Sequence, residues 1–183
     1  NLTTVPVTVT VTNVNEDPTL LNGVMTTTED GVFSLFDTSA ILDGNYASTL
    51  LTMLNQGNVS LANIFTKQAG DNSYDWHAAV DNQGATISVI ELNNGNIIGG
   101  YNPFSWTSIQ GYTYETGSDA FLFNLTTSAV YEIRSGQGHV AYNRDTYGPT
   151  FGGGHDLNIN GALSGGYANI GYYYGDYAQA GTA

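Results

Sequence analysis

The chain has 183 residues, 41% of them hydrophobic, so it is long enough to bury a core of its own. Only 10% of the residues are charged, and 16 acidic residues against three basic ones give a net charge of −13 at pH 7. This charge argues against nucleic acids and anionic membranes as partners, because both repel an acidic surface. The absence of cysteine excludes disulfides, thiol catalysis and thiolate zinc sites.

The first strand-like pattern covers residues 2–14, where Val and Thr alternate as they do in a half-buried β-strand. Asn15, Glu16 and Asp17 follow, and Pro18 ends the strand. We expect residues 1–18 to be a terminal strand and an acidic linker, with Asn15 and Asp17 as candidate calcium ligands. An ordinary Asn/Asp/Pro turn is the alternative. Because the chain begins within a strand, we expect it to be part of a longer protein.

The remaining pattern predicts a mostly β domain with a few helices. A helix is expected within residues 40–55, where leucines gather on one face. Short strands are expected at 86–92, 96–101, 119–125, 129–134, 139–143 and 156–160. They are separated by Gly- and Asn-rich turns, so we expect two packed sheets. No apolar run reaches 18 residues, and we therefore expect no direct membrane insertion.

Three motifs, in this order and spacing, resemble the TLDc domain family: "NIIGGYNPFSW" (96–106), "SDAFLFNL" (118–125) and "YGPTFGGGHDLNI" (147–159). The stretches "STLLTMLNQG" and "IFTKQAGDNSYDWHAAVDNQGATISVIEL" resemble the family's early helix and its next block, in which a His lies mid-helix. The resemblance implies a TLDc-like two-sheet β-sandwich with flanking α-helices, placed here at residues 19–183. It implies no established enzyme chemistry, but an intracellular interaction scaffold linked to stress resistance.

The segment in front resembles the end of a bacterial cadherin-like or immunoglobulin-like repeat. Together with the acidic, cysteine-free composition, it makes the chain similar to the peptide-binding ligand module of large bacterial RTX adhesins. This resemblance implies an extracellular, calcium-dependent adhesion module on the bacterial cell surface. We expect it to be a non-enzymatic monomer that binds short peptide segments on host or partner-cell proteins. Calcium-dependent glycan binding and the TLDc-type scaffold role are the alternatives.

The motif "TFGGGHDL" raises the question of a phosphate or metal site. No Lys follows the glycines, so it is not a phosphate loop, and the three histidines lack metal-ligand spacing. We interpret the motif as architecture, in which His155 and Asp156 hydrogen-bond backbone where the chain bends. A ligand facing Asp156 or Asp145 is the alternative. No Gly-x-Ser-x-Gly elbow occurs, although an acid pair for glycoside hydrolysis remains open.

Acidic turns supply the other candidate calcium ligands, since calcium prefers oxygen donors. Besides Asn15 and Asp17, the candidates are Asp43, Asn45, Asp71, Ser73, Asp75, Glu115, Asp119 and Asp145. Each of these turns is alternatively a plain solvated loop.

Aromatic side chains are the candidate ligand-contacting groups, because Tyr and Trp combine contact area with a polar atom. The predicted ligand-binding set is Tyr101, Trp106, Tyr114, Tyr147 and Asp156. Core packing is the alternative for each aromatic residue, and for Trp106 in particular.

Overall fold

The computed structural model describes residues 24–26, 34–36, 41–42, 44–55 and 61–176. The chain divides into two compact units, Asn1–Asn63 and Ile64–Ala183. The predicted strand at 2–14, the candidate calcium ligands Asn15, Asp17 and Asp43, and the boundary at residues 18–19 lie outside the described residues. In the described part, neither helix has the length and apolar character needed to cross a lipid bilayer.

The first unit contains the strands β1 (Val24–Thr26) and β2 (Ser34–Phe36), which pair antiparallel, and the helix α1 (Gly44–Leu54). Ala47, Leu50 and Leu54 are the buried residues of α1. Their spacing of three and four residues places them on one helical face, which confirms the helix predicted within 40–55. The candidate calcium ligand Asn45 is exposed in the first turn of this helix.

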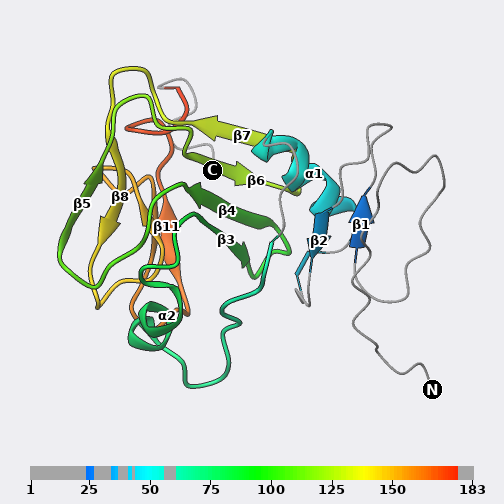
Figure 1. Ribbon diagram of the computed structural model, residues 1–183, viewed down its shortest axis with the longest axis horizontal. Helices are drawn as coiled ribbons and strands as arrows, with labels where there is room; N and C mark the ends of the chain where they lie inside the picture. The colour runs from blue at the N-terminus through cyan, green and yellow to red at the C-terminus, as the bar shows by residue number, and fades with distance from the viewer. Residues whose placement is uncertain (1–23, 27–33, 37–40, 43, 56–60, 177–183) are drawn as a thin grey trace. The chain divides into compact units, whose positions relative to one another are not determined.

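The second unit is a sandwich of two antiparallel sheets (Figure 1), as the sequence predicted. One sheet has the order β3-β4-β6-β7, formed by Thr86–Glu91, Ile97–Asn102, Phe121–Asn124 and Ala129–Glu132. The other has the order β11-β10-β9-β8-β5, formed by Gly166–Ala168, Leu157–Ile159, Thr150–Phe151, His139–Asn143 and Gly111–Tyr114. The six predicted strands are present as β3, β4, β6, β7, β8 and β10, whereas β5, β9 and β11 lie outside the predicted ranges.

Aromatic rings fill the space between the two sheets. The Trp106 ring packs edge-on against Trp76, at 5.1 Å between centroids, and against Phe151, at 5.3 Å. Phe151 contacts Tyr174, whose hydroxyl donates to the Val140 carbonyl at 2.7 Å. Each of these rings is at most 5% exposed, so the aromatic motif "NPFSW" contributes to the core.

The helix α2 (Ser73–Val80) begins at a capping box. The Asn72 side chain accepts the Tyr74 N–H at 2.8 Å, and the Asp75 carboxylate accepts the Asn72 N–H at 2.9 Å. Asp71 accepts the Gln68 N–H at 2.7 Å. Reciprocal bonds of this kind satisfy the free N–H groups of a helix start. The oxygen-rich stretch "GDNSYD" therefore starts α2, and the helix carries His77 in its middle, as the TLDc resemblance implied.

The "FGGGHD" motif is a buried polar clamp between the β9–β10 turn and the C-terminal segment. Asp156 is 0% exposed. Its Oδ1 accepts three consecutive peptide N–H groups, those of Tyr172 and Tyr173 at 3.0 Å and that of Tyr174 at 3.2 Å. A carboxylate held by several N–H groups satisfies its hydrogen-bonding needs away from water. The architectural interpretation is confirmed for Asp156, whereas the His155 ring, among the described residues, contacts the Tyr167 hydroxyl and not the backbone.

Two of the three glycines of this motif make room for the clamp. Gly152 has a φ of +83°, and a Cβ at this position would overlap Asp156 Oδ2. A Cβ at Gly153 would overlap the Tyr173 ring, whereas one at Gly154 would lie 3.7 Å from the nearest atom of Tyr172. Left-handed backbone and close approach of neighbouring atoms both require glycine. Gly152 and Gly153 are therefore required by packing, and Gly154 is not.

Because Gly152 is tightly packed and Gly154 is not, we expect alanine at these two positions to have very different effects on the free energy of unfolding. Gly152→Ala should lower the free energy of unfolding by on the order of 2 kcal/mol, because it adds backbone strain and displaces the Asp156 carboxylate. Gly154→Ala is the matched control and should change the free energy of unfolding by less than about 0.5 kcal/mol. Urea unfolding of both variants measures this difference, and equal effects would contradict the clamp.

Candidate ligand-binding face

The outer side of strands β5 and β8 carries tyrosine and histidine side chains. These strands pair antiparallel, with Tyr112 opposite Tyr142 and Tyr114 opposite His139. A register shift at Thr113/Tyr114 brings His139 and Tyr142 to the same side of the sheet. Tyr112 and Tyr114 remain 43% and 61% exposed. Alternation along β5 therefore turns two rings toward solvent.

A chain of ring contacts connects these residues. His139 lies between three tyrosine rings, with centroid distances of 4.5 Å to Tyr112, 5.1 Å to Tyr114 and 5.2 Å to Tyr173. Tyr142 follows at 4.8 Å from Tyr112. Edge-to-face and tilted contacts of this kind are favourable for aromatic rings.

The same chain continues onto the loops around the glycine motif. Tyr142 contacts His155 at 5.1 Å and Tyr147 at 5.8 Å between centroids. The Tyr167 hydroxyl lies 3.3 Å from His155 Nδ1, and the Tyr112 hydroxyl donates to the Gly153 carbonyl at 3.0 Å. We call the set the tyrosine face. It comprises Tyr112, Tyr114, His139, Tyr142, Tyr147, His155, Tyr167, Tyr172 and Tyr173.

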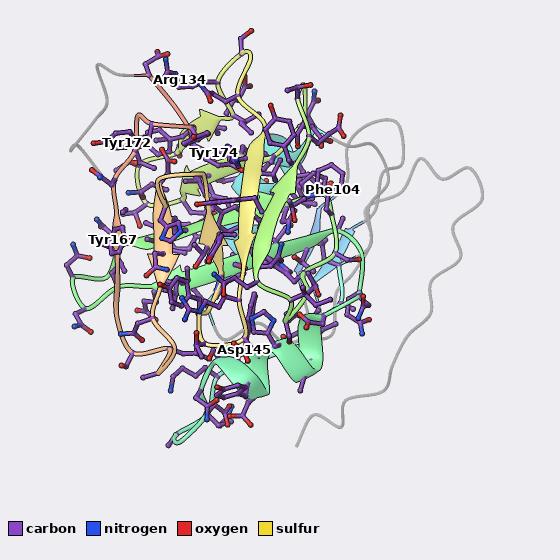
Figure 2. All side chains as sticks on the ribbon, turned by 90° about the vertical axis from the view of Figure 1, so that its left-hand side faces the viewer. Phe104, Arg134, Asp145, Tyr167, Tyr172 and Tyr174 are labelled. Carbon is purple, nitrogen blue, oxygen red and sulfur yellow. The ribbon has the colours of Figure 1, made fainter. Side chains whose placement is uncertain are left out.

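Figure 2 looks onto this side of the domain, with β5 and β8 in front and Tyr167 and Tyr172 on the C-terminal segments beside them. Tyr167 and Tyr172 are each 51% exposed. Arg134 holds the second of these segments, because its Nη1 donates to the carbonyls of Gly171, at 3.1 Å, and Tyr172, at 2.9 Å. The exposed rings are thus attached to segments with fixed backbones.

Burial favours the neutral forms of two polar side chains of the tyrosine face, His155 and Tyr112. Burial lowers the pKa of His155, an effect that the neighbouring Asp156 only partly offsets, so this imidazole carries no charge. Burial also raises the pKa of Tyr112, so its hydroxyl keeps its proton. At His155 and Tyr112 the face therefore offers neutral hydrogen-bonding groups and ring surface.

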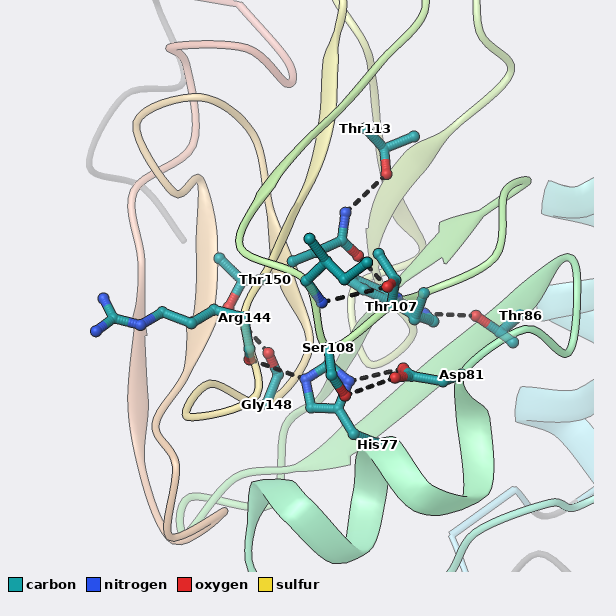
Figure 3. A network of polar contacts seen from close by, with 12 residues as sticks. His77, Asp81, Thr86, Thr107, Ser108, Thr113, Arg144, Gly148 and Thr150 are labelled. Atoms are coloured by element: carbon teal, nitrogen blue, oxygen red, sulfur yellow. Dashed lines mark hydrogen bonds and ion pairs between the residues drawn. The ribbon is translucent and has the colours of Figure 1, made fainter.

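A polar network fixes the turn at one end of the tyrosine face (Figure 3). His77 Nδ1 lies 2.7 Å from Asp81 Oδ1, and the Ser108 hydroxyl donates to Asp81 Oδ2 at 2.7 Å. His77 Nε2 lies 2.8 Å from the Arg144 carbonyl. Both ring nitrogens of His77 thus face acceptors, and Ser108 bonds to the aspartate instead of the histidine. This geometry differs from a Ser-His-Asp triad, in which the histidine accepts the serine proton.

A hollow of about 590 Å³ lies between the two sheets, away from this network. Its apolar lining comes from both sheets and includes Ile90, Ile98, Leu122, Leu157, Ile159 and Ile170. Its rim carries one charged residue, Glu91, beside several asparagines. The hollow continues the hydrophobic interior and brings together no set of reactive groups.

The candidate calcium ligands occupy separate places in the second unit. Asp71 and Asp75 accept N–H groups at the start of α2, and Ser73 is buried in that helix. Glu115 and Asp119 lie in the loop between β5 and β6, and Asp145 follows β8. Among the described residues, no three acidic or histidine side chains form a group that could hold a metal ion. The calcium site stays a prediction.

The predicted ligand-contacting residues divide into two groups. Tyr114 and Tyr147 belong to the tyrosine face. Trp106, Tyr101 and Asp156 are 1%, 6% and 0% exposed, which favours the alternative role of each in the core, and their assignment to ligand binding stays a prediction. The predicted ligand-binding set did not include the remaining seven members of the face. The alternation in "GYTYE" (111–115) is the signal that would have indicated two outward rings.

The clamp beneath the tyrosine face predicts a specific pH dependence. Burial raises the pKa of Asp156, and the three peptide N–H groups only partly offset this rise. The folded chain therefore keeps this proton at pH values where the unfolded chain has lost it. The contribution of Asp156 to stability is fully present below its ordinary pKa, near 3.8, and decreases as the pH rises through the folded pKa.

Asp156→Asn removes this titration while retaining an acceptor oxygen. The stability of this variant relative to wild type should therefore increase as the pH is raised from about 3.5, and then level off. Urea unfolding at several pH values measures the difference, with Gly154→Ala as an uncharged control that follows wild type throughout. A constant or decreasing difference would contradict the raised pKa.

The comparison with known families gives a match to the TLDc domain over residues 35–181, which includes the whole tyrosine face. The comparison with curated proteins gives no match. The family match agrees with the two-sheet sandwich and its helices, and it indicates a protein-interaction scaffold. The chain therefore belongs to the TLDc domain family.

Proposed function

We propose that this domain is a non-enzymatic protein-interaction module whose tyrosine face binds a polypeptide segment. The observation that carries the proposal is the continuous chain of partly exposed tyrosine and histidine rings on one side of the five-stranded sheet. Tyrosine is enriched in protein interfaces, because it provides a large contact area and a hydroxyl at a low cost in conformational entropy. A rigid backbone beneath the rings reduces the ordering cost of binding further.

The finer form of the proposal is a calcium-dependent adhesion module of an extracellular bacterial adhesin, which binds short peptide segments on other cells. The net charge of −13 and the acidic turns support it, because calcium neutralises carboxylates through oxygen ligands. Glu115 directly follows Tyr114, and Asp119 lies in the same loop. Calcium bound there would order the loop beside the tyrosine face.

A random decapeptide library displayed on phage tests whether the face binds peptides. Wild type should enrich peptide families whose affinity falls at least about tenfold for the variant Tyr114→Ser/Tyr167→Ser/Tyr172→Ser. These three side chains are all more than half exposed, so their removal should leave the fold intact. The matched control is Tyr74→Ser, which removes a 58% exposed ring from α2 and should bind normally.

Failure to enrich any peptide family, or enrichment that the triple variant retains, would contradict a peptide-binding face. Exposed tyrosine rings also suit sugars, so the same variants on a glycan array test the lectin alternative. Glycan binding that depends on these three tyrosines, without peptide binding, would replace the proposal.

A thermal melt tests the calcium dependence. Calcium at about 100 times its dissociation constant should raise the melting temperature by roughly 5–10 °C, and excess chelator should reverse the shift. Glu115→Gln/Asp119→Asn should abolish the shift, whereas the control Glu91→Gln, on the other sheet, should retain it. An unchanged melting temperature would contradict the calcium-dependent adhesion module, but it would not contradict the proposal that the domain is a protein-interaction module.

A further inference from the structure

We infer that the tyrosine face selects a peptide segment with a single carboxylate, and that the guanidinium group of Arg144 binds this carboxylate. The inference rests on the proposed function, because it assigns the chemistry of the ligand at the same face.

The distribution of positive charge is the first observation. The chain has three basic residues, Lys67, Arg134 and Arg144. Arg134 and Arg144 both lie at the tyrosine face, where Arg134 bonds the Tyr172 carbonyl and Arg144 covers the Tyr147 ring. Lys67 lies in the loop before α2 and donates to the Gln68 carbonyl at 3.1 Å. An otherwise acidic protein thus places most of its positive charge at its most aromatic surface.

The backbone of Arg144 is fixed from inside the domain. Its carbonyl lies 2.8 Å from His77 Nε2 and accepts the Tyr147 N–H at 2.9 Å. His77 is 3% exposed and is itself held by Asp81. The side chain points away from this network, as Figure 3 shows. The turn therefore presents the guanidinium group from a constrained position, which lowers the entropy cost of binding.

The guanidinium group has no carboxylate partner within the described part of the chain. His77–Asp81 is the only ion pair found there, and Arg144 does not pair with Asp145, which follows it. The guanidinium carbon lies 5.2 Å from the centroid of the Tyr147 ring. This contact occupies one face of the guanidinium group, and among the described residues no hydrogen bond uses its N–H donors. These donors suit a carboxylate in a bidentate geometry.

The charge of the whole protein limits the ligand to few negative charges. With its net charge of −13, the chain repels polyanions over a range set by the ionic strength. A segment with one carboxylate gains the contact to Arg144 without strong repulsion. The neighbouring tyrosine rings then contact an apolar or aromatic side chain of the same segment. The expected ligand is therefore an aromatic or apolar residue close to a lone carboxylate.

Two matched pairs of probe peptides test the inference. The first pair is acetyl-Gly-Phe-Gly with a free C-terminal carboxylate and the same peptide as its amide. The second is acetyl-Gly-Phe-Glu-amide and acetyl-Gly-Phe-Gln-amide. Titrations are followed by ¹H–¹⁵N NMR of the domain, in chelator so that bound calcium does not contribute. In at least one pair, the carboxylate peptide should bind about fivefold more tightly than its neutral partner.

Variants distinguish a specific contact of the Arg144 guanidinium group from a general effect of net charge on peptide binding. Arg144→Gln should abolish the preference for the carboxylate, and Arg144→Lys should keep part of it, because lysine retains the charge without the planar donors. The control Lys67→Gln makes the same change in net charge and should keep the full preference. Asp145→Asn should strengthen binding of the carboxylate peptides only. The NMR spectrum of each variant reports whether its fold is unchanged.

The outcomes distinguish this inference from the proposed function. Equal binding of the carboxylate and neutral peptides, with shifts confined to the tyrosine face, would overturn the role of Arg144 and support the interaction module. A preference that survives in Arg144→Gln would also overturn it. Absence of binding by all four peptides would count against both. A preference within the first pair identifies the bound carboxylate as that of a chain terminus, and a preference within the second pair identifies it as that of a side chain.

Discussion

The second unit depends on one buried carboxylate. Asp156 lies in the interior of the sandwich and is bonded by the peptide N–H groups of Tyr172, Tyr173 and Tyr174, 16 to 18 residues further along the chain. A buried carboxylate without such donors would destabilise the fold by several kcal/mol, on the order of the whole stability of a domain. The bonds therefore require the C-terminal segment to lie against the glycine turn.

The tyrosine face is a consequence of this constraint. Because Asp156 binds three successive peptide groups, their side chains must leave the segment in different directions. Tyr174 points into the core, Tyr173 lies against Gly153 and contacts His139, and Tyr172 remains exposed. At the other end of the face, His77 fixes the turn that carries Arg144. Two buried polar networks thus support an exposed aromatic surface, and satisfied networks of this kind favour a single conformation.

Much of the fold was predictable, because six strands and the helix α1 each carry a periodic pattern long enough to recognise. The strand β9 has two residues, which is too short for an alternating pattern, whereas β5 carries an alternation in "GYTY" that the prediction did not use. The start of α2 was interpreted as a possible calcium loop, because Asn and Asp serve equally as helix caps and as metal ligands. Of the tyrosine face, only Tyr114 and Tyr147 were predicted. A shift in strand register, which places His139 and Tyr142 on one side, leaves no local signal.

The sequence by itself determined the properties that depend on composition and local order. These are the acidity, the absence of thiol chemistry, the two-sheet β class and the motifs shared with TLDc domains. The tertiary structure alone decided which polar groups form hydrogen bonds within the chain and which can bind a ligand. Asp156 accepts hydrogen bonds from distant peptide groups, whereas the Arg144 guanidinium group, within the part of the chain that is described, contacts the Tyr147 ring. The physical reason is that burial and hydrogen-bond partners arise from contacts between segments far apart in sequence, and no local pattern encodes them.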